Sequence, residues 1–288
     1  MGHDGAVSEP TSVPAGTVAE LWRYPVKSLQ GEPVDRLVLT AGPDRSGVVG
    51  DRAWGIVDRR TGHVLSAKTV PALLHAVASS SGEGTGAVAI TLPDGTALSS
   101  DDGVACDRTL SAWLGRDVGL RPADPARAEA EGAAGSFQMT FDPPDDDAEL
   151  VEIDMPPDSF VDMAGVHVLT TGSLATMAVA NANGDWAPRR FRPNVLVDTG
   201  AAIGHPEDAW VGGRLAVGAA TLEVRMRTVR CAMPLRAQPA LGGRPALARN
   251  VDVYRTMARA HDNHLGAYAE VAVAGTVALG DPVTAPAA

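Results

Sequence analysis

The stretch VHVLTTGSLATMAVA at residues 166–180 predicts a β-strand that passes directly into an α-helix. Its first five residues are rich in Val, Leu and Thr, a composition that favours a strand. Thr171 or Ser173 then offers a hydroxyl that can cap the helix of residues 174–180. Residues 166–180 therefore predict a strand-to-helix unit, and the segments around it decide which fold this unit belongs to.

Further short strands are predicted on both sides of this unit. C-terminal to it they lie at residues 194–198, 214–217, 221–226 and 269–274, with an amphipathic helix at about 252–264. N-terminal to it, strands at 18–22 and 36–39 are followed by hairpins at 54–65 and 88–98 and by a short helix at 109–114. Because strands dominate both halves, we expect a mainly β, α+β protein with two barrel-like domains rather than a doubly wound sheet.

The domain boundaries follow from composition. Residues 1–16 are small and polar and predict a flexible tail, and residues 17–135 form the expected N-terminal β domain. Between residues 142 and 158 there are eight acidic residues, four prolines and no Lys or Arg, which predicts a solvated connector over residues 136–160. Residues 161–288 are then the C-terminal β-barrel domain.

Overall composition excludes several classes of function. A formal net charge of −11 argues against nucleic acid as a partner, because phosphate-backbone recognition needs a clustered positive surface. No apolar run approaches the roughly 18 residues of a membrane helix, and the N-terminus lacks a signal-peptide pattern, so we expect a cytoplasmic protein without membrane contact. Two cysteines are too few for an intrinsic iron–sulfur cluster. Any redox chemistry must therefore use a borrowed metal and borrowed electrons.

Three polar segments are candidates for ligand binding, and each also has a plainer interpretation. Lys27, one of two lysines against twenty-two arginines, stands beside Ser28 after a proline turn, a pair that suits an anion but also a simple surface turn. Arg52 follows a glycine-flanked turn and can bind a phosphate or a ring carbonyl. Arg192 and Asn194 close a run of three arginines that can hold a charged heterocycle or form a solvated basic turn.

The fourth candidate segment, residues 225–234, contains Cys231 directly after Arg230. Three arginines precede Cys231 within seven residues, and positive surroundings favour the thiolate, the form that binds metals. Cys106, by contrast, stands beside Asp107 and is interpreted as structural. A buried, inert thiol is the plainer alternative for Cys231 as well.

Six segments in this order resemble the MOSC superfamily, named for the C-terminal domain of molybdenum cofactor sulfurase, together with the β-barrel domain that often precedes it. The resemblance runs from about Val18 to Val283. The segments are YPVKS (24–28), GDRAW (50–54), VLTTGSL (168–174), FRPN (191–194), RC (230–231), and LGAY (265–268) with GDPV (280–283). Each is short, but their order over most of the chain is specific.

The resemblance implies a molybdenum cofactor, that is, a molybdopterin whose molybdenum is bound by Cys231. Members such as the amidoxime-reducing component reduce N-hydroxylated small molecules with two electrons passed on by a redox partner. The iron–sulfur extension of some bacterial relatives is lacking, so a separate electron-donor protein is expected. By the same matching, the cofactor-binding residues would be Lys27, Ser28, Arg52, Lys68, Thr171, Ser173, Arg192, Asn194 and Arg230.

The chain departs from the family pattern in two places. Reducing members usually carry two threonines after the cysteine, whereas this chain has PLRAQP at residues 234–239. Lys68 stands where relatives tend to have arginine, and the change loses a bidentate fork. Two other functions therefore stay open. One is a molybdopterin or sulfur carrier that uses Cys231 without turnover, and the other is a MOSC scaffold redirected to another reaction.

Overall fold

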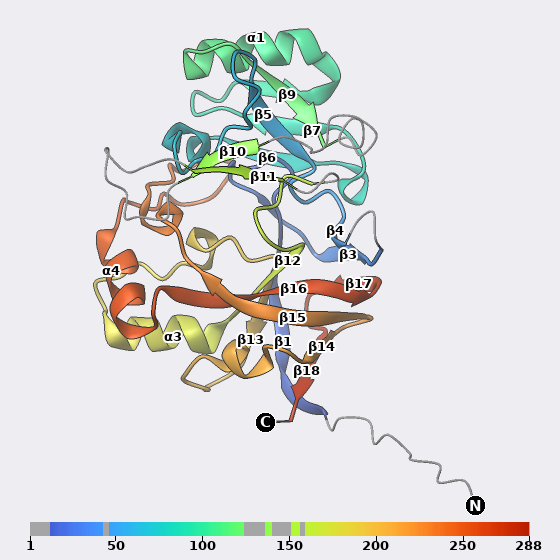
Figure 1. Ribbon diagram of the computed structural model, residues 1–288, viewed down its shortest axis with the longest axis vertical. Coiled ribbons are helices and arrows are strands. Elements are labelled where there is room, and N and C mark those ends of the chain that lie inside the picture. The colour runs from blue at the N-terminus through green and yellow to red at the C-terminus, as the bar shows by residue number, and fades with distance from the viewer. Residues whose placement is uncertain (1–11, 43–45, 124–135, 140–150, 156–158, 288) are drawn as a thin grey trace, which may run out of the picture.

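A closed barrel of seven strands forms the lower half of the molecule (Figure 1). The computed structural model describes residues 12–42, 46–123, 136–139, 151–155 and 159–287. Around the barrel the strand order is β13-β12-β16-β15-β14-β18-β1, and β1 pairs back with β13. The strands are β1 (Ser12–Arg23), β12 (Val166–Thr170), β13 (Val195–Asp198), β14 (Arg214–Val217), β15 (Ala220–Val229), β16 (His264–Val273) and β18 (Pro282–Pro286).

The interior of the barrel is filled by alternate aliphatic side chains of these strands. Val168, Val195, Leu222 and Ala267 are fully buried there. Each buried Val or Leu contributes about 1.5–3 kcal/mol relative to an exposed one, so this core is a main source of stability. The predicted strand-to-helix unit is confirmed as β12 and α3 (Thr171–Ala180). Because α3 crosses over the barrel, β12 and β13 run parallel, whereas the other barrel pairs are antiparallel.

β1 comes from the N-terminal part of the chain but completes the C-terminal barrel. It pairs with β13 along residues 17–21 and with β18 along residues 12–17. The expected flexible tail of residues 1–16 is therefore wrong for Ser12–Gly16, and its remainder lies outside the described residues. These residues have the composition of a tail, and the β18 strand that pairs with them lies at the far end of the chain. Local composition therefore did not indicate a strand here.

Smaller sheets above the barrel form the second part of the molecule (Figure 1). Their core contains Ile56, Leu73, Ile90 and Leu110. The predicted hairpin at residues 88–98 is confirmed, while residues 54–65 form a single antiparallel bridge and the first strand there pairs mainly with β9. The elements are β5 (Trp54–Asp58), β6 (Val77–Ser80), β7 (Val88–Thr91), β8 (Ala97–Ser99), β9 (Val118–Pro122) and α1 (Gly103–Leu114).

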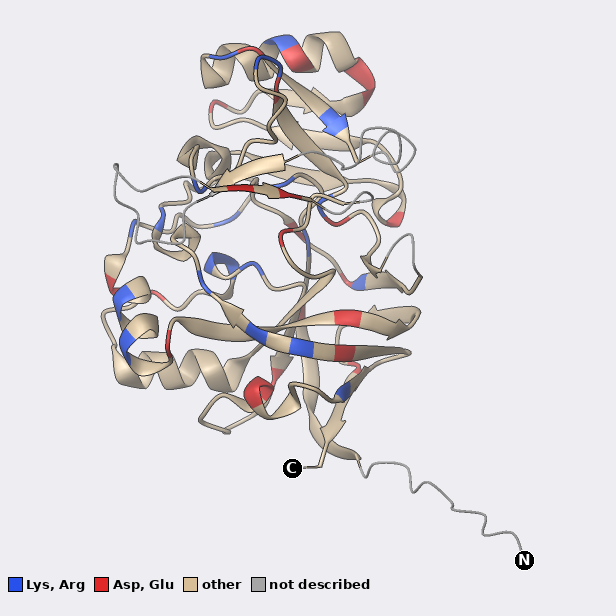
Figure 2. Ribbon diagram, in the orientation of Figure 1, with Lys and Arg blue, Asp and Glu red and all other residues tan. Residues whose placement is uncertain are grey.

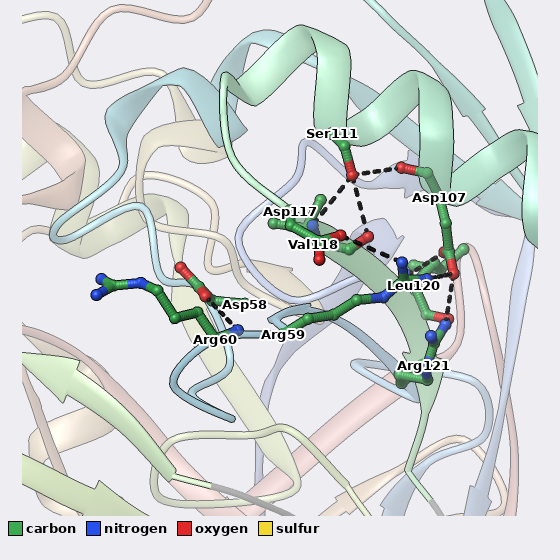
Figure 3. A network of polar contacts seen from close by, with 9 residues as sticks. All are labelled: Asp58, Arg59, Arg60, Asp107, Ser111, Asp117, Val118, Leu120 and Arg121. Atoms are coloured by element: carbon green, nitrogen blue, oxygen red, sulfur yellow. Dashed lines mark hydrogen bonds and ion pairs between the residues drawn. The ribbon is translucent and has the colours of Figure 1, made fainter.

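A polar network fastens α1 to this part (Figure 3). The buried Asp107 carboxylate accepts hydrogen bonds from the Leu120 backbone (2.7 Å), from Arg121 (2.9 Å) and from Arg59 (2.5 Å). These bonds satisfy a charge that would otherwise be costly to bury. The neighbouring Cys106 is 1% exposed. Its burial, together with the negative charge of Asp107, raises its pKa to about 11, which agrees with a structural cysteine.

The remaining strands join the two parts. β3 (Arg36–Thr40) pairs with β17 (Gly275–Ala278) near the C-terminus. Within the predicted acidic connector, a two-stranded ribbon is formed by β10 (Ser136–Met139) and β11 (Val151–Asp154). The other elements are β2 (Glu32–Pro33), β4 (Gly47–Val48), α4 (Val251–Ala260) and the 3-10 helices Pro71–His75, Gly82–Gly84, Ser100–Asp102, Pro188–Arg190, Pro206–Trp210 and Met233–Leu235. None of the helices in the described ranges has the length and apolarity to span a membrane.

Candidate functional site

A pocket opens between the barrel and the loops above it, and we call it the Cys231 pocket. Its empty space is about 720 Å³, part of it open to solvent. Seven of the residues predicted for the site line it, namely Lys27, Ser28, Arg52, Arg192, Asn194, Arg230 and Cys231.

Three of these residues have backbones in the left-handed region. The φ angles are 69° at Ser28, 46° at Arg52 and 56° at Arg192. Residues other than glycine adopt this region at a cost of about 1–3 kcal/mol, and such residues cluster at functional sites. Backbone hydrogen bonds hold the conformation, since Arg52 N donates to Tyr24 O (2.7 Å) and Lys27 N to Trp54 O (2.8 Å).

The Tyr24 ring lies between two of the pocket arginines. The guanidinium of Arg52 is 4.5 Å and that of Arg192 is 4.2 Å from the ring centroid. Burial alone would lower the pKa of Arg52, but its ion pair with the buried Asp51 raises it. Tyr24 and Asp51 thus fix the arginines. The YPVKS motif contains Tyr24, but the sequence does not indicate its role, because its contact with Arg192 joins residues far apart in the chain.

Both lysines of the chain converge on Asp162. Lys27 Nζ and Lys68 Nζ (2.7 Å) form ion pairs with its two oxygens, and both ammonium groups lie over the Phe137 ring. Burial would raise the pKa of Asp162, but the two lysines outweigh it and hold this pKa well below its usual range. Asp162 was not predicted, because the sequence does not show which of its 35 acidic residues faces the two lysines.

Arg230 is held from both sides immediately before the cysteine. Its guanidinium donates to Phe191 O (2.8 Å) and lies 3.4 Å from His167 Nε2. Its backbone carbonyl accepts from the Asn263 side chain, and its N–H donates to Asn263 O (2.8 Å). Cys231 is a free, half-buried thiol at the wall of the pocket. The thiol is therefore accessible and attached to a fixed backbone.

The structure does not bring Thr171 and Ser173 to the Cys231 pocket, in contrast to the expectation from the resemblance. Thr171 Oγ1 contacts Asp198 (3.2 Å), and Ser173 Oγ contacts His205 Nδ1 (3.0 Å). These side chains serve the N-terminal turn of α3, where Thr170 is the capping residue. Lys68 lies beside the pocket through its pairing with Asp162.

Two family models cover most of the chain. The MOSC N-terminal beta barrel domain matches residues 15–124, and the MOSC domain matches residues 157–284. The chain belongs to the MOSC family. This family is associated with the molybdenum cofactor.

Curated relatives of this MOSC protein match over one short stretch. Human mitochondrial amidoxime reducing component 2 is 48% identical over 59 residues, which is 20% of this chain and 17% of the relative. Human mitochondrial amidoxime-reducing component 1 is 44% identical over 59 residues, with the same coverage. The match thus spans less than a fifth of the length of these relatives. Among solved structures, the YUAD protein of Bacillus subtilis gives a TM-score of 0.45 at 11% identity, covering 96% of this chain and 97% of that one.

The charges around the MOSC protein's pocket suit an anionic cofactor. Among the described residues, the cations are Lys27, Lys68, Arg52, Arg192 and Arg230, and the carboxylates paired with them are Asp51 and Asp162. Arg230 Nε is buried without a hydrogen-bond partner in these ranges. Lys and Arg positions gather in the loops between the barrel and the upper sheets (Figure 2). A surplus of buried cations beside an accessible thiol fits a phosphate-bearing pterin with a thiolate-bound metal.

Proposed function

We propose that this MOSC protein binds the molybdenum cofactor in the Cys231 pocket and reduces N-hydroxylated small molecules. The observation that carries the proposal is the accessible Cys231 thiol on a wall whose neighbouring side chains are buried cations. The named activity of the amidoxime reducing components supports the reaction type. The net reaction replaces N–OH by N–H and releases water, which consumes two electrons and two protons.

The residues divide between anion binding and orientation. Lys27, Arg52, Arg192 and Arg230 would hold the anionic groups of the cofactor, and Cys231 would bind the metal. Asn194 is oriented for this wall because its amide accepts from His167 N (3.0 Å) and donates to Trp22 O (3.2 Å). When bound, the cofactor would supply the two-electron chemistry.

The chain's own residues would admit the substrate and manage protons. The exposed apolar side chains of Met163 and Val229 line the mouth and would contact the substrate. Tyr268 also lines the pocket, and burial raises its pKa, so its hydroxyl keeps a proton that it can donate. A separate electron-donor protein would deliver the electrons.

The test begins with protein made in a host that synthesises molybdopterin. We expect about one molybdenum per chain by elemental analysis, and reduction of benzamidoxime with a reduced viologen dye as electron donor. Cys231→Ala should abolish both, because the metal loses its thiolate ligand, while Cys106→Ala should retain both because Cys106 is buried in a different core.

The two readouts separate the alternatives. Molybdenum without turnover would favour a carrier over an enzyme. Absence of molybdenum from the wild-type protein, or equal molybdenum content in Cys231→Ala, would contradict the assigned site.

A further inference from the structure

A second hollow lies beside the Cys231 pocket, and we call it the arginine hollow. Its empty space is about 210 Å³, and its wall includes Trp22, Tyr24, Gln30, Arg189, Arg192 and Arg244. Arg192 lines both spaces, so the two are neighbours. It is much smaller than the Cys231 pocket.

The loop that follows Cys231 builds one side of this hollow. Gln238 and Leu247 exchange two backbone hydrogen bonds of 2.8 Å, which closes residues 238–247 into a loop that presents Arg244. Arg189 Nη2 donates to Pro245 O (2.6 Å) and fastens this loop to the 3-10 helix Pro188–Arg190. The stretch that departs from the family pattern thus runs directly into this loop.

Several buried polar atoms of the hollow have no partner within the described ranges. These are Arg189 Nη1, Arg244 Nε and Nη1, and Gln30 Oε1. The described residues also supply no carboxylate within ion-pair distance of Arg189, Arg192 or Arg244. Unmade hydrogen bonds of buried groups are costly, and three like charges around one small space repel each other.

The nearby acids are engaged elsewhere. Glu20 accepts from Trp22 Nε1 (2.7 Å), and Glu32 pairs with Arg23 (2.9 Å). Asp185 pairs with Arg190 (2.5 Å). The hollow therefore carries a net positive charge. Burial lowers the pKa of Arg192 to about 10, and it also lowers the pKa values of Arg189 and Arg244. An anion bound there would supply both the missing acceptors and the missing charge.

The Gln30 amide narrows the choice of anion. Its Nε2 donates to Leu74 O (2.9 Å), which fixes the amide orientation and leaves Oε1 as an acceptor. An acceptor in an anion site favours a ligand that has a hydroxyl hydrogen to donate. With a second pKa of about 6, a phosphate monoester keeps this hydrogen on about one molecule in ten at pH 7, and the acceptor would select that form, whereas sulfate carries no such hydrogen.

We propose that Arg189, Arg192, Arg244 and Gln30 form a site for a phosphate monoester or inorganic phosphate. The site stands on contacts of this chain alone and does not depend on molybdenum. It gives a role to the arginine run before residue 194 and to the altered loop after Cys231, neither of which the cofactor proposal explains fully.

The test is calorimetric titration of the full chain, free of molybdenum cofactor, with inorganic phosphate and with sulfate at matched ionic strength. Wild type should bind phosphate, and more weakly sulfate. Arg189→Gln and Arg244→Gln should each weaken phosphate binding about tenfold, since each removes a charge-assisted hydrogen bond. Arg249→Gln, which changes an exposed arginine two residues beyond the loop, should bind like wild type.

A role in folding alone would give a different result. If Arg244 only supported the loop, Arg244→Gln would lower the thermal midpoint without phosphate. The proposed site predicts an unchanged or higher midpoint, because a half-buried cation with two unsatisfied nitrogen atoms is removed. Equal phosphate affinity of wild type and both hollow variants would overturn the proposal, as would the absence of phosphate binding.

Cofactor-loaded protein then identifies the source of the phosphate. If loading leaves the titration unchanged, the site takes a free phosphate or monoester. If loading blocks phosphate binding, the hollow holds a phosphate group of the cofactor in the Cys231 pocket, because Arg192 lines both spaces. Both results support the site and differ in which molecule fills it.

Discussion

His167 is held as a neutral ring in the wall of the Cys231 pocket. Its Nδ1 lies 3.3 Å from Arg192 O, and its Nε2 faces the Arg230 guanidinium at 3.4 Å. Burial lowers the pKa of His167 well below the ordinary value of 6.5, and the positive charge of Arg230 adds to this effect. The neutral ring with its proton on Nδ1 satisfies both neighbours, so a second proton would destroy the contact with Arg230.

This predicts a pH dependence of stability. Below pH 6.5 the unfolded chain binds a proton at residue 167 that the folded chain refuses, so the free energy of unfolding falls as pH falls, until the lower folded pKa is reached. One such group contributes a slope of up to about 1.4 kcal/mol per pH unit. We expect the free energy of unfolding, measured with urea between pH 7.0 and 5.5, to depend less steeply on pH for His167→Gln than for wild type. Equal slopes would show that His167 titrates alike in both states.

Single residues of the site were predictable where a short motif contains them. Lys27, Arg52 and Cys231 were assigned from their neighbours in sequence, and all three line one pocket. Asp162 was missed because its partner Lys27 is 135 residues away, and no local pattern reports such a pairing. His167 was read as part of a strand, since its contacts with Arg192 and Arg230 exist only after the barrel closes.

Among the elements, β1 depends most on a close backbone approach. Gly16 has φ 142°, and a Cβ there would lie 2.1 Å from Asp198 O in β13. We expect Gly16→Ala to lower the free energy of unfolding by about 3 kcal/mol or more, because backbone must move on both sides. Gly212→Ala is the control, since its Cβ meets open space at φ 83° and should cost only about 1 kcal/mol. Urea unfolding measures both, and equal losses would contradict the clash.

The extent of elements was less predictable than their type. The predicted helix at residues 109–114 ends correctly at Gly115, which has the left-handed C-cap conformation, but it starts six residues earlier at Gly103. Its first turns carry the exposed Val104 and the buried Cys106, which form no clear amphipathic pattern. β1 likewise starts at Ser12, where proline and small residues resemble a tail until β18 is present to pair with them.

At the scale of the whole molecule, the two parts interleave through strand exchange. β1 lies within the C-terminal barrel, and β3 pairs with β17. Composition predicted two β domains, and the strand-rich parts agree with that class, but the boundaries at residues 135 and 161 stay predictions. A change in composition indicates a linker, but it does not indicate that a strand from one side of the linker pairs with strands on the other side. The Cys231 pocket lies at this junction and takes residues from both parts.

The interleaving predicts that the C-terminal part cannot fold alone. A fragment of residues 159–288 lacks β1, so β13 and β18 become unpaired edges and the barrel core opens where Val18 and Leu21 pack. We expect no cooperative urea transition by circular dichroism. Residues 12–23 appended after residue 288 through a short Gly/Ser linker should restore it, because Ser12 pairs antiparallel with Pro286 and a hairpin can deliver the strand.

The matched control appends the same strand with Val18→Asp and Leu21→Asp. These changes keep the length and the hydrogen-bonding backbone but place two charges in the barrel core, so cooperativity should be lost again. A cooperative transition of the bare fragment would show that six strands suffice. The seventh strand would then serve mainly to bring Tyr24, Lys27 and Ser28, which follow directly after it, to the rim where Arg192 and Cys231 lie.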